Sequence, residues 1–104
     1  DVVSTQWKQF ERDCAKFFEA DRFPANSGGK ADFAGEGVVG QCKLVKAMGL
    51  PELTRLAEEM AEVACEDEIG VVCIKLRRGR GKPSSPLLVM TFAQAERAGL
   101  GRRQ

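Results

Sequence analysis

The residues with the clearest capacity for chemistry are a carboxylate, an amide and an ammonium group on one short stretch of the chain, Asp32, Gln41 and Lys43. A tight glycine turn at 35–37 separates Asp32 from a strand-like run at 38–45, which carries the other two. Because alternate strand residues point to the same face, Gln41 and Lys43 are expected side by side on one face of that strand. The pattern fits either a solvated sheet face or a chemical site, and spacing alone leaves both interpretations open.

These groups match the needs of phosphodiester hydrolysis, which uses a divalent cation, oxygen ligands for it and a positive charge near the phosphate. Mg²⁺ prefers hard oxygen donors and usually takes only one or two carboxylates from a protein. Asp32 could supply a carboxylate, Gln41 an amide oxygen and Cys42 its backbone carbonyl. Lys43 could hold the attacking water or contact the scissile phosphate. Glu11 lies at the edge of a helical apolar stripe and is either a half-exposed surface carboxylate or a further member of the cluster.

The elements that must position these groups follow from hydrophobic periodicity. The stripe of the first helix comprises Trp7, Phe10, Cys14, Phe17 and Phe18. Residues 21–29 are expected to form a connector. The expected elements are a helix at 4–20, a hairpin with strands at 30–33 and 38–45, a helix from Pro51 to about Ala64, strands at 69–76 and 86–92, and a short helix at 91–98. The order α-β-β-α-β-β-α predicts one α/β domain over 1–104, a small mixed sheet flanked by helices, with a frayed tail at 99–104.

Composition excludes several classes of function. The chain has no histidine, which excludes His-metal and Cys–His nucleophile sites. The four cysteines lack CxxC spacing, so we interpret them as reduced thiols of a cytoplasmic protein and disfavour a thiol-redox function. No apolar run approaches the about 18–20 residues of a membrane span, and no signal-peptide pattern opens the chain. The net charge of +1 does not by itself indicate a nucleic-acid partner, although basic residues gather at 75–82.

Asp32, the turn and then Gln41-Cys42-Lys43 resemble the D-(E/Q)xK core of the PD-(D/E)XK nuclease superfamily. The flanking pattern is similar to the small Holliday junction resolvases of archaeal and phage type, and the resemblance covers residues 7–92. Glu11 matches the glutamate of the first helix, and Ser27 is a looser match to a loop serine. Two departures are that Ala31 replaces the proline and Gln41 the usual glutamate. The second removes a negative charge, so metal binding would depend more on the remaining carboxylates.

The resemblance implies a restriction-endonuclease-like fold and a magnesium-dependent endonuclease, with Mn²⁺ able to substitute. It implies a homodimer that cuts two symmetric strands of a four-way DNA junction in a prokaryotic or virus-infected cytoplasm, with no nucleotide cofactor and no membrane partner. The implied catalytic residues are Glu11, Asp32, Gln41, Lys43 and Ser27, and the implied metal ligands are Asp32, Gln41, Glu11 and the Cys42 carbonyl. The expected DNA-binding residues are Arg22, Lys30, Lys46, Arg77, Arg78, Arg80 and Lys82.

Three alternatives stay open. The basic loop at 77–82 could be a flexible, solvated tip between two strands. The same fold could serve a restriction- or repair-type nuclease that acts on linear duplex DNA. Gln41 also leaves room for a non-catalytic DNA-binding domain with a degenerate site.

Overall fold

The structure is a computed structural model that describes residues 2–22 and 30–101, with side chains from residue 5 onward. Its elements are α1 (Val2–Phe17), β1 (Asp21–Arg22), β2 (Phe33–Gly35), β3 (Val38–Val45), α2 (Leu50–Val63), β4 (Ile69–Leu76), β5 (Leu87–Val89) and α3 (Phe92–Arg97). The protein is a small α/β domain with a mixed five-stranded sheet flanked by helices, as predicted at this level. No helix among the described residues is long and apolar enough to cross a membrane.

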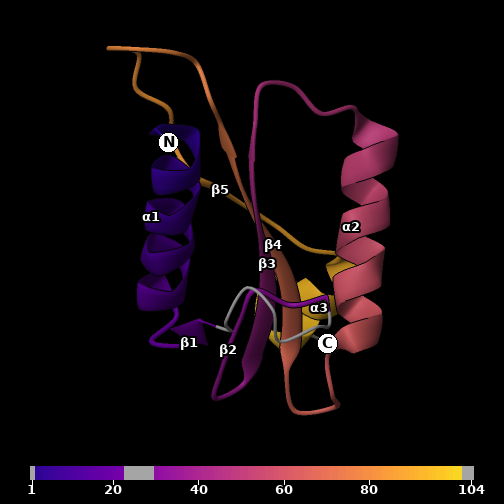
Figure 1. Ribbon diagram of the computed structural model, residues 1–104. Helices are drawn as coiled ribbons and strands as arrows, with labels where there is room; N and C mark the ends of the chain where they lie inside the picture. Colours follow the sequence, from indigo (N-terminus) through magenta and orange to yellow (C-terminus); the bar gives the residue numbers. More distant parts are fainter. Residues whose placement is uncertain (1, 23–29, 102–104) are drawn as a thin grey trace.

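The sheet has the order β1-β2-β3-β4-β5 (Figure 1). The pairs β1–β2, β2–β3 and β4–β5 are antiparallel, while β3 and β4 are parallel. Gly37, with φ 79°, allows the tight β2–β3 turn that the sequence predicts. Parallel neighbours need a crossover, and α2 supplies it between β3 and β4.

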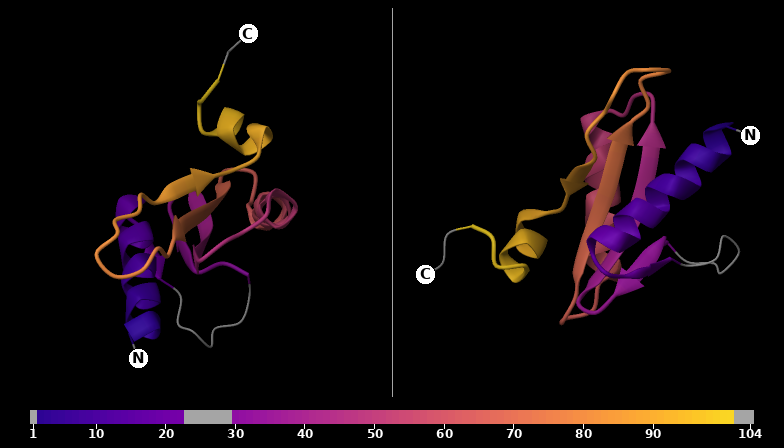
Figure 2. Two further views of the ribbon diagram at one scale, coloured as in Figure 1. Left: turned by 90° about the horizontal axis from the view of Figure 1, so that it is seen from above. Right: turned by 90° about the vertical axis from the view of Figure 1, so that its left-hand side faces the viewer.

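Helices α1 and α2 lie on opposite faces of the sheet (Figure 2), which divides the core into two layers. The α1-side layer is built around Phe10, Cys14, Ala15, Phe33, Val38, Cys42, Val71 and Cys73. The α2-side layer is built around Val39, Leu56, Met60 and Val72. The side chains of β3 therefore point alternately into the two layers, as the sequence predicts. Strand β4 is a buried interior strand, as its β-branched run indicates.

Several predicted elements needed correction. The predicted connector at 21–29 begins with strand β1, whose two residues are too few to show a hydrophobic period. Helix α1 spans Val2–Phe17, not 4–20, and Glu19 just beyond it has φ 53°. The apolar stripe of α1 is narrower than predicted, because Trp7 and Phe17 are 47% and 74% exposed. The last strand is shorter than 86–92 and covers only Leu87–Val89.

Candidate functional site

Asp32 lies just before β2, which covers Phe33–Gly35 and not the predicted 30–33. Ala31 contacts the α2-side layer and Phe33 belongs to the α1-side layer, so two alternate residues face opposite sides. The Asp32 N–H donates to the Gly40 carbonyl at 2.8 Å, and its carboxylate Oδ2 accepts from the Cys42 N–H at 2.8 Å. Bulge-like irregularities of this kind are common next to active sites. The backbone of β3 therefore holds the Asp32 carboxylate at the sheet edge.

Gln41 carries a buried oxygen that has no hydrogen-bond partner among the residues that the structure describes. Its Nε2 donates to the Lys30 carbonyl at 3.0 Å, which fixes the orientation of the amide. Its Oε1 is buried and accepts no hydrogen bond within the described part of the chain. An unsatisfied buried acceptor costs about 1–3 kcal/mol, and a bound cation would supply the missing partner. The Gln41 amide oxygen and the Asp32 carboxylate are both hard oxygen donors, the kind that Mg²⁺ prefers.

Lys43 lies on the same face of β3 as Gln41, as the strand alternation predicts, and is half-buried. No carboxylate of residues 5–22 and 30–101 lies within 4 Å of its ammonium group. The hydrogen bond from Arg55 lowers the pKa of Glu52 at the start of α2, and the charges of Arg55 and Lys43 add to this effect. The Lys43 ammonium is thus near α2 and forms no ion pair with the described carboxylates.

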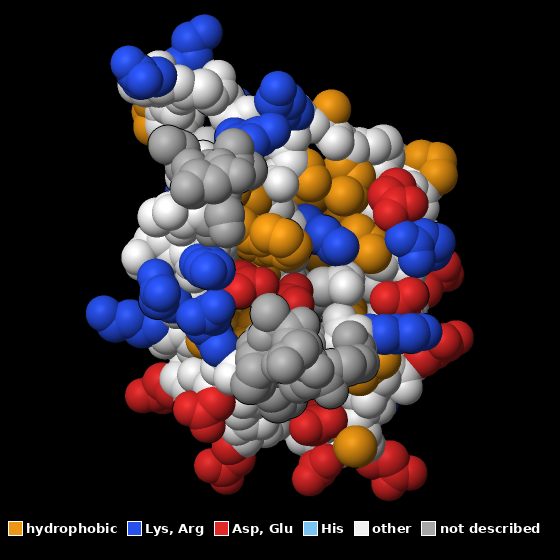
Figure 3. Space-filling view, in the orientation of Figure 1, with side chains coloured by type: hydrophobic (Ala, Val, Ile, Leu, Met, Phe, Trp, Pro, Cys, Tyr) orange, Lys and Arg blue, Asp and Glu red, His pale blue; other side chains and the backbone are white. Residues whose placement is uncertain are grey.

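Glu11 projects from α1 and is held by Arg22 at 3.0 Å, with the glutamate side chain 16% exposed. Arg22 pairs in register with Phe33, the residue after Asp32, so the ion pair lies at the same edge of the sheet. Figure 3 shows the molecule from the same side as Figure 1. Basic side chains gather on the side of α1 in this view, and acidic side chains lie beside them near the centre. Arg22 neutralises the charge of Glu11. The described side chains contain no group of three or more His, Cys, Asp or Glu residues that could hold a metal ion.

The other predicted site residues have different outcomes. The Cys42 N–H points to Asp32, and because the N–H and C=O of one strand residue point to the same side, its carbonyl faces the same edge. Ser27 lies outside the described residues. Lys30 pairs with Glu59 of α2 at 3.8 Å, and sequence reasoning did not assign Glu59 to the site. Glu59 lies in the α2 sequence between Leu56 and Met60, which are buried, and this position indicates that Glu59 lies beside the sheet.

All four cysteines are free thiols, as predicted. Cys14, Cys42 and Cys73 are buried and interact directly behind the site, on the α1 side of the sheet. Hydrogen bonds with the Cys14 and Cys73 thiols, together with burial, raise the pKa of Cys42. The Cys42 side chain is therefore a neutral part of the core, and the site uses its backbone.

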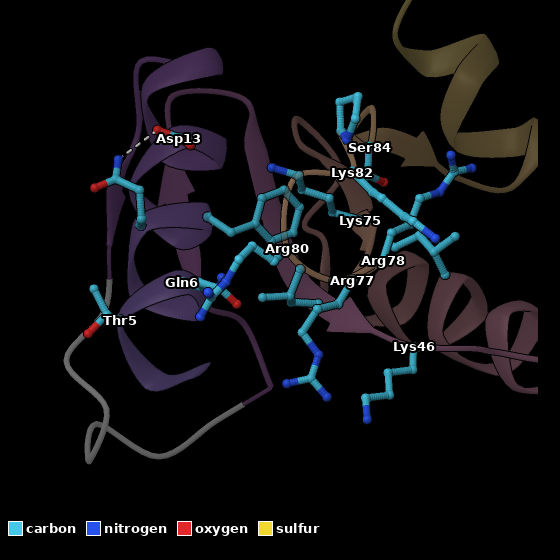
Figure 4. Close-up of a pocket in the computed structure, with 16 residues that line it drawn as sticks. Thr5, Gln6, Asp13, Lys46, Lys75, Arg77, Arg78, Arg80, Lys82 and Ser84 are labelled. Atoms are coloured by element: carbon cyan, nitrogen blue, oxygen red, sulfur yellow. Dashed lines mark hydrogen bonds between the residues drawn. The ribbon is translucent and has the colours of Figure 1, made fainter. Parts of the chain in front are cut away.

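The predicted DNA-binding residues divide into two groups. Arg22 and Lys30 lie near Asp32 and are engaged in ion pairs. The remaining five line a groove of about 1010 Å³ between α1 and the segment 77–84 (Figure 4). Lys75, which was not among the predicted DNA-binding residues, also lines it, because β4 alternation turns it toward α1. The basic loop is therefore separate from Gln41 and Lys43, whose side chains lie on the other face of the sheet.

Comparisons with family models, curated proteins and solved structures found no match to this chain.

Proposed function

We propose that this chain is a divalent-metal-dependent, structure-selective endonuclease of restriction-endonuclease-like fold that resolves four-way DNA junctions. The observation that carries the proposal is the buried Oε1 of Gln41, which has no hydrogen-bond partner within residues 5–22 and 30–101. It lies one residue along β3 from the amide that fixes the Asp32 carboxylate. Lys43, without an ion pair in the described part of the chain, shares its face of the strand. The order of elements, with the aspartate before β2 and the amide and lysine on β3, also supports it.

Mg²⁺ would be held by the Asp32 carboxylate, Gln41 Oε1 and the Cys42 carbonyl, with Mn²⁺ able to substitute. When bound, the ion would supply Lewis-acid polarisation of the phosphate and a lowered pKa for water. The Cys42 N–H keeps the Asp32 carboxylate oriented, and the Lys30 carbonyl keeps the Gln41 amide oriented. Two fixed oxygens are the preorganisation that such a site requires.

Lys43 contributes positive charge where negative charge builds on the phosphate oxygens. In the hydrolysis, a water oxygen bonds to phosphorus and the bond from phosphorus to the leaving sugar oxygen breaks. The products are a phosphate monoester and a free hydroxyl group, with one proton released to solvent. Glu11 is not a direct participant while Arg22 neutralises it; its role is to fix Arg22 at the edge where the DNA backbone approaches.

We also propose that the enzyme acts as a homodimer, because a four-way junction offers two symmetric strands. The sheet edge at β5 supports this assembly. Leu87 and Leu88 on this edge strand are 60% and 44% exposed, and the neighbouring Phe92 is 89% exposed. An exposed apolar edge strand is a template for pairing with a second copy.

The proposal is tested by incubating the protein with Mg²⁺ and either a labelled four-way junction or a linear duplex of the same arm sequence. Wild type is expected to nick the junction at symmetric positions, and chelation of the metal is expected to stop it. Asp32→Asn keeps an oxygen for the Cys42 N–H but removes the charge, so its nicking rate should fall at least about 10²-fold.

Equal nicking by wild type and Asp32→Asn, or no nicking by wild type with Mg²⁺, would overturn the proposal. A preference for linear DNA would select a restriction- or repair-type nuclease. Junction binding that is independent of metal, with no cleavage, would select a non-catalytic domain.

A further inference from the structure

The groove between α1 and the segment 77–84 has a large excess of positive charge. Its lining includes six cationic side chains: Lys46, Lys75, Arg77, Arg78, Arg80 and Lys82. Among the described lining residues one carboxylate is present, Asp13, and its Oδ1 already accepts from Gln9 Nε2 at 2.9 Å. None of the six cations has a carboxylate of the described residues within 4 Å. The groove therefore presents uncompensated charge to a ligand.

Part of this charge is fixed in place by the fold. The Arg77 N–H donates to the Val45 carbonyl at 2.6 Å, which anchors the start of the loop to the end of β3. The Arg77 Nε is buried and has no hydrogen-bond acceptor in the described part of the chain. The Lys75 ammonium lies 6.0 Å from the centre of the Phe10 ring, which places it over the wall formed by α1. Figure 4 shows the Lys75 and Arg80 side chains reaching toward α1, while the Arg77 side chain points to another side of the groove.

The groove is separate from the candidate cleavage residues. Gln41 and Lys43 face α2, whereas the groove is lined by residues on the α1 side. Val45, beside which the loop begins, lies four residues along β3 from Gln41, which is about 13 Å at the rise of a strand. A ligand in the groove therefore does not depend on the residues that would bind the metal.

From these observations we propose that the groove is a second, metal-independent site that binds the phosphate backbone of nucleic acid. Duplex DNA carries one charge per about 1.7 Å of its axis, a density that six clustered cations can neutralise. An acidic peptide in extended form carries at most one charge per about 3.3 Å. The amides of Gln6 and Gln9 on the α1 wall are neutral donors of the kind that contact phosphate oxygens. The proposal goes beyond cleavage and stands whether or not the chain is a nuclease.

The test measures binding of a labelled DNA duplex by fluorescence anisotropy over a salt series, with EDTA present so that cleavage plays no part. The groove variant is Arg78→Gln/Arg80→Gln/Lys82→Gln, which changes three exposed loop residues. The matched control is Lys8→Gln/Arg12→Gln/Lys16→Gln, which removes the same charge from exposed positions of α1 outside the groove. Asp13→Asn removes the carboxylate that lines the groove.

If six phosphates are contacted, the slope of log K against log salt is about −5.4 for wild type and about −2.7 for the groove variant. The groove variant is expected to bind at least about tenfold more weakly, whereas the control binds like wild type and Asp13→Asn binds more tightly. Equal weakening by the two triple variants, or wild-type affinity of the groove variant, would overturn the proposal. Displacement of the DNA by polyglutamate at equal charge concentration would overturn the assignment to nucleic acid.

Discussion

Gln41→Met removes the buried amide oxygen that has no partner in the described part of the chain and keeps the length of the side chain. The change also removes the hydrogen bond to the Lys30 carbonyl, which is exposed and contributes about 0.5–1.5 kcal/mol. Relief of the unsatisfied oxygen offsets this by about 1–3 kcal/mol. Without metal, the variant is therefore expected to be at least as stable as wild type, to within about 0.5 kcal/mol.

With Mg²⁺, wild type is expected to become more stable than Gln41→Met. A ligand that binds the native state at ten times its Kd raises the free energy of unfolding by about 1.4 kcal/mol. For a chain of 104 residues this raises the Tm by about 5–10 °C. Gln41→Met lacks one of the proposed ligands, so its Tm should rise much less over the same Mg²⁺ series. Thermal unfolding followed by circular dichroism measures both quantities.

A matched control is Gln6→Met, which makes the same chemical change at an exposed position on α1. It should keep the full response of wild type to Mg²⁺. An equal Mg²⁺ response in Gln41→Met and wild type would refute the role of the amide oxygen. So would a metal-free Gln41→Met that is several kcal/mol less stable, because that would mean that the oxygen already has a partner.

Two further predictions test the structure around the site. Gln94 is 3% exposed and its Oε1 accepts from the Gly70 N–H at 2.8 Å. Gln94→Leu should therefore lower the free energy of unfolding by about 1–3 kcal/mol and the Tm by about 4–8 °C per kcal/mol. An unchanged Tm would contradict this contact. The Glu68 carboxylate hydrogen-bonds the exposed Cys65 and raises its pKa, because a negative charge beside a thiol disfavours the thiolate. Alkylation of Cys65 by iodoacetamide should therefore reach half its maximal rate at a higher pH than an ordinary thiol, and Glu68→Gln should move that midpoint to lower pH.

Local patterns were sufficient to predict much of the fold. The run of β3 is rich in β-branched and apolar residues and carries Gln41 and Lys43 at alternate positions, so both its bounds and its two faces could be predicted. Pro51 in the first turn marks the start of α2, and Thr91 caps α3 with a hydroxyl that accepts from the Gln94 N–H. The glycines at 35–37 predict the turn before β3. Each of these signals lies within a few residues of the structure that it indicates.

The parts that could not be predicted depend on contacts between distant segments. Strand β1 exists because Arg22 pairs with Phe33, eleven residues later in the sequence. The same arginine reaches Glu11 on α1, so the carboxylate that the resemblance implies as a metal ligand is paired with a cation. The bulge-like irregularity at Asp32 depends on the hydrogen bond from the Cys42 N–H, and the sequence contains no local signal for this irregularity.

The basic groove is a second example of such a contact. Its two walls are α1 and the segment 77–84, which are far apart in the sequence and meet because both lie on the same face of the sheet. Sequence patterning identified the basic loop as a candidate for DNA binding but did not indicate on which face of the sheet it lies. The alternation of β3 and β4, taken together with the position of α1, explains why the loop lies on the α1 side.

The most direct test of the proposed activity is single-turnover nicking of a four-way junction in Mg²⁺ by wild type and Lys43→Ala. Lys43 is half-buried and has no ion pair in the described part of the chain, so the variant is expected to keep its Tm and its affinity for the junction in EDTA. Loss of one charge-stabilising group should lower the nicking rate about 10²–10³-fold. A wild-type nicking rate in a folded Lys43→Ala protein would contradict the proposed site.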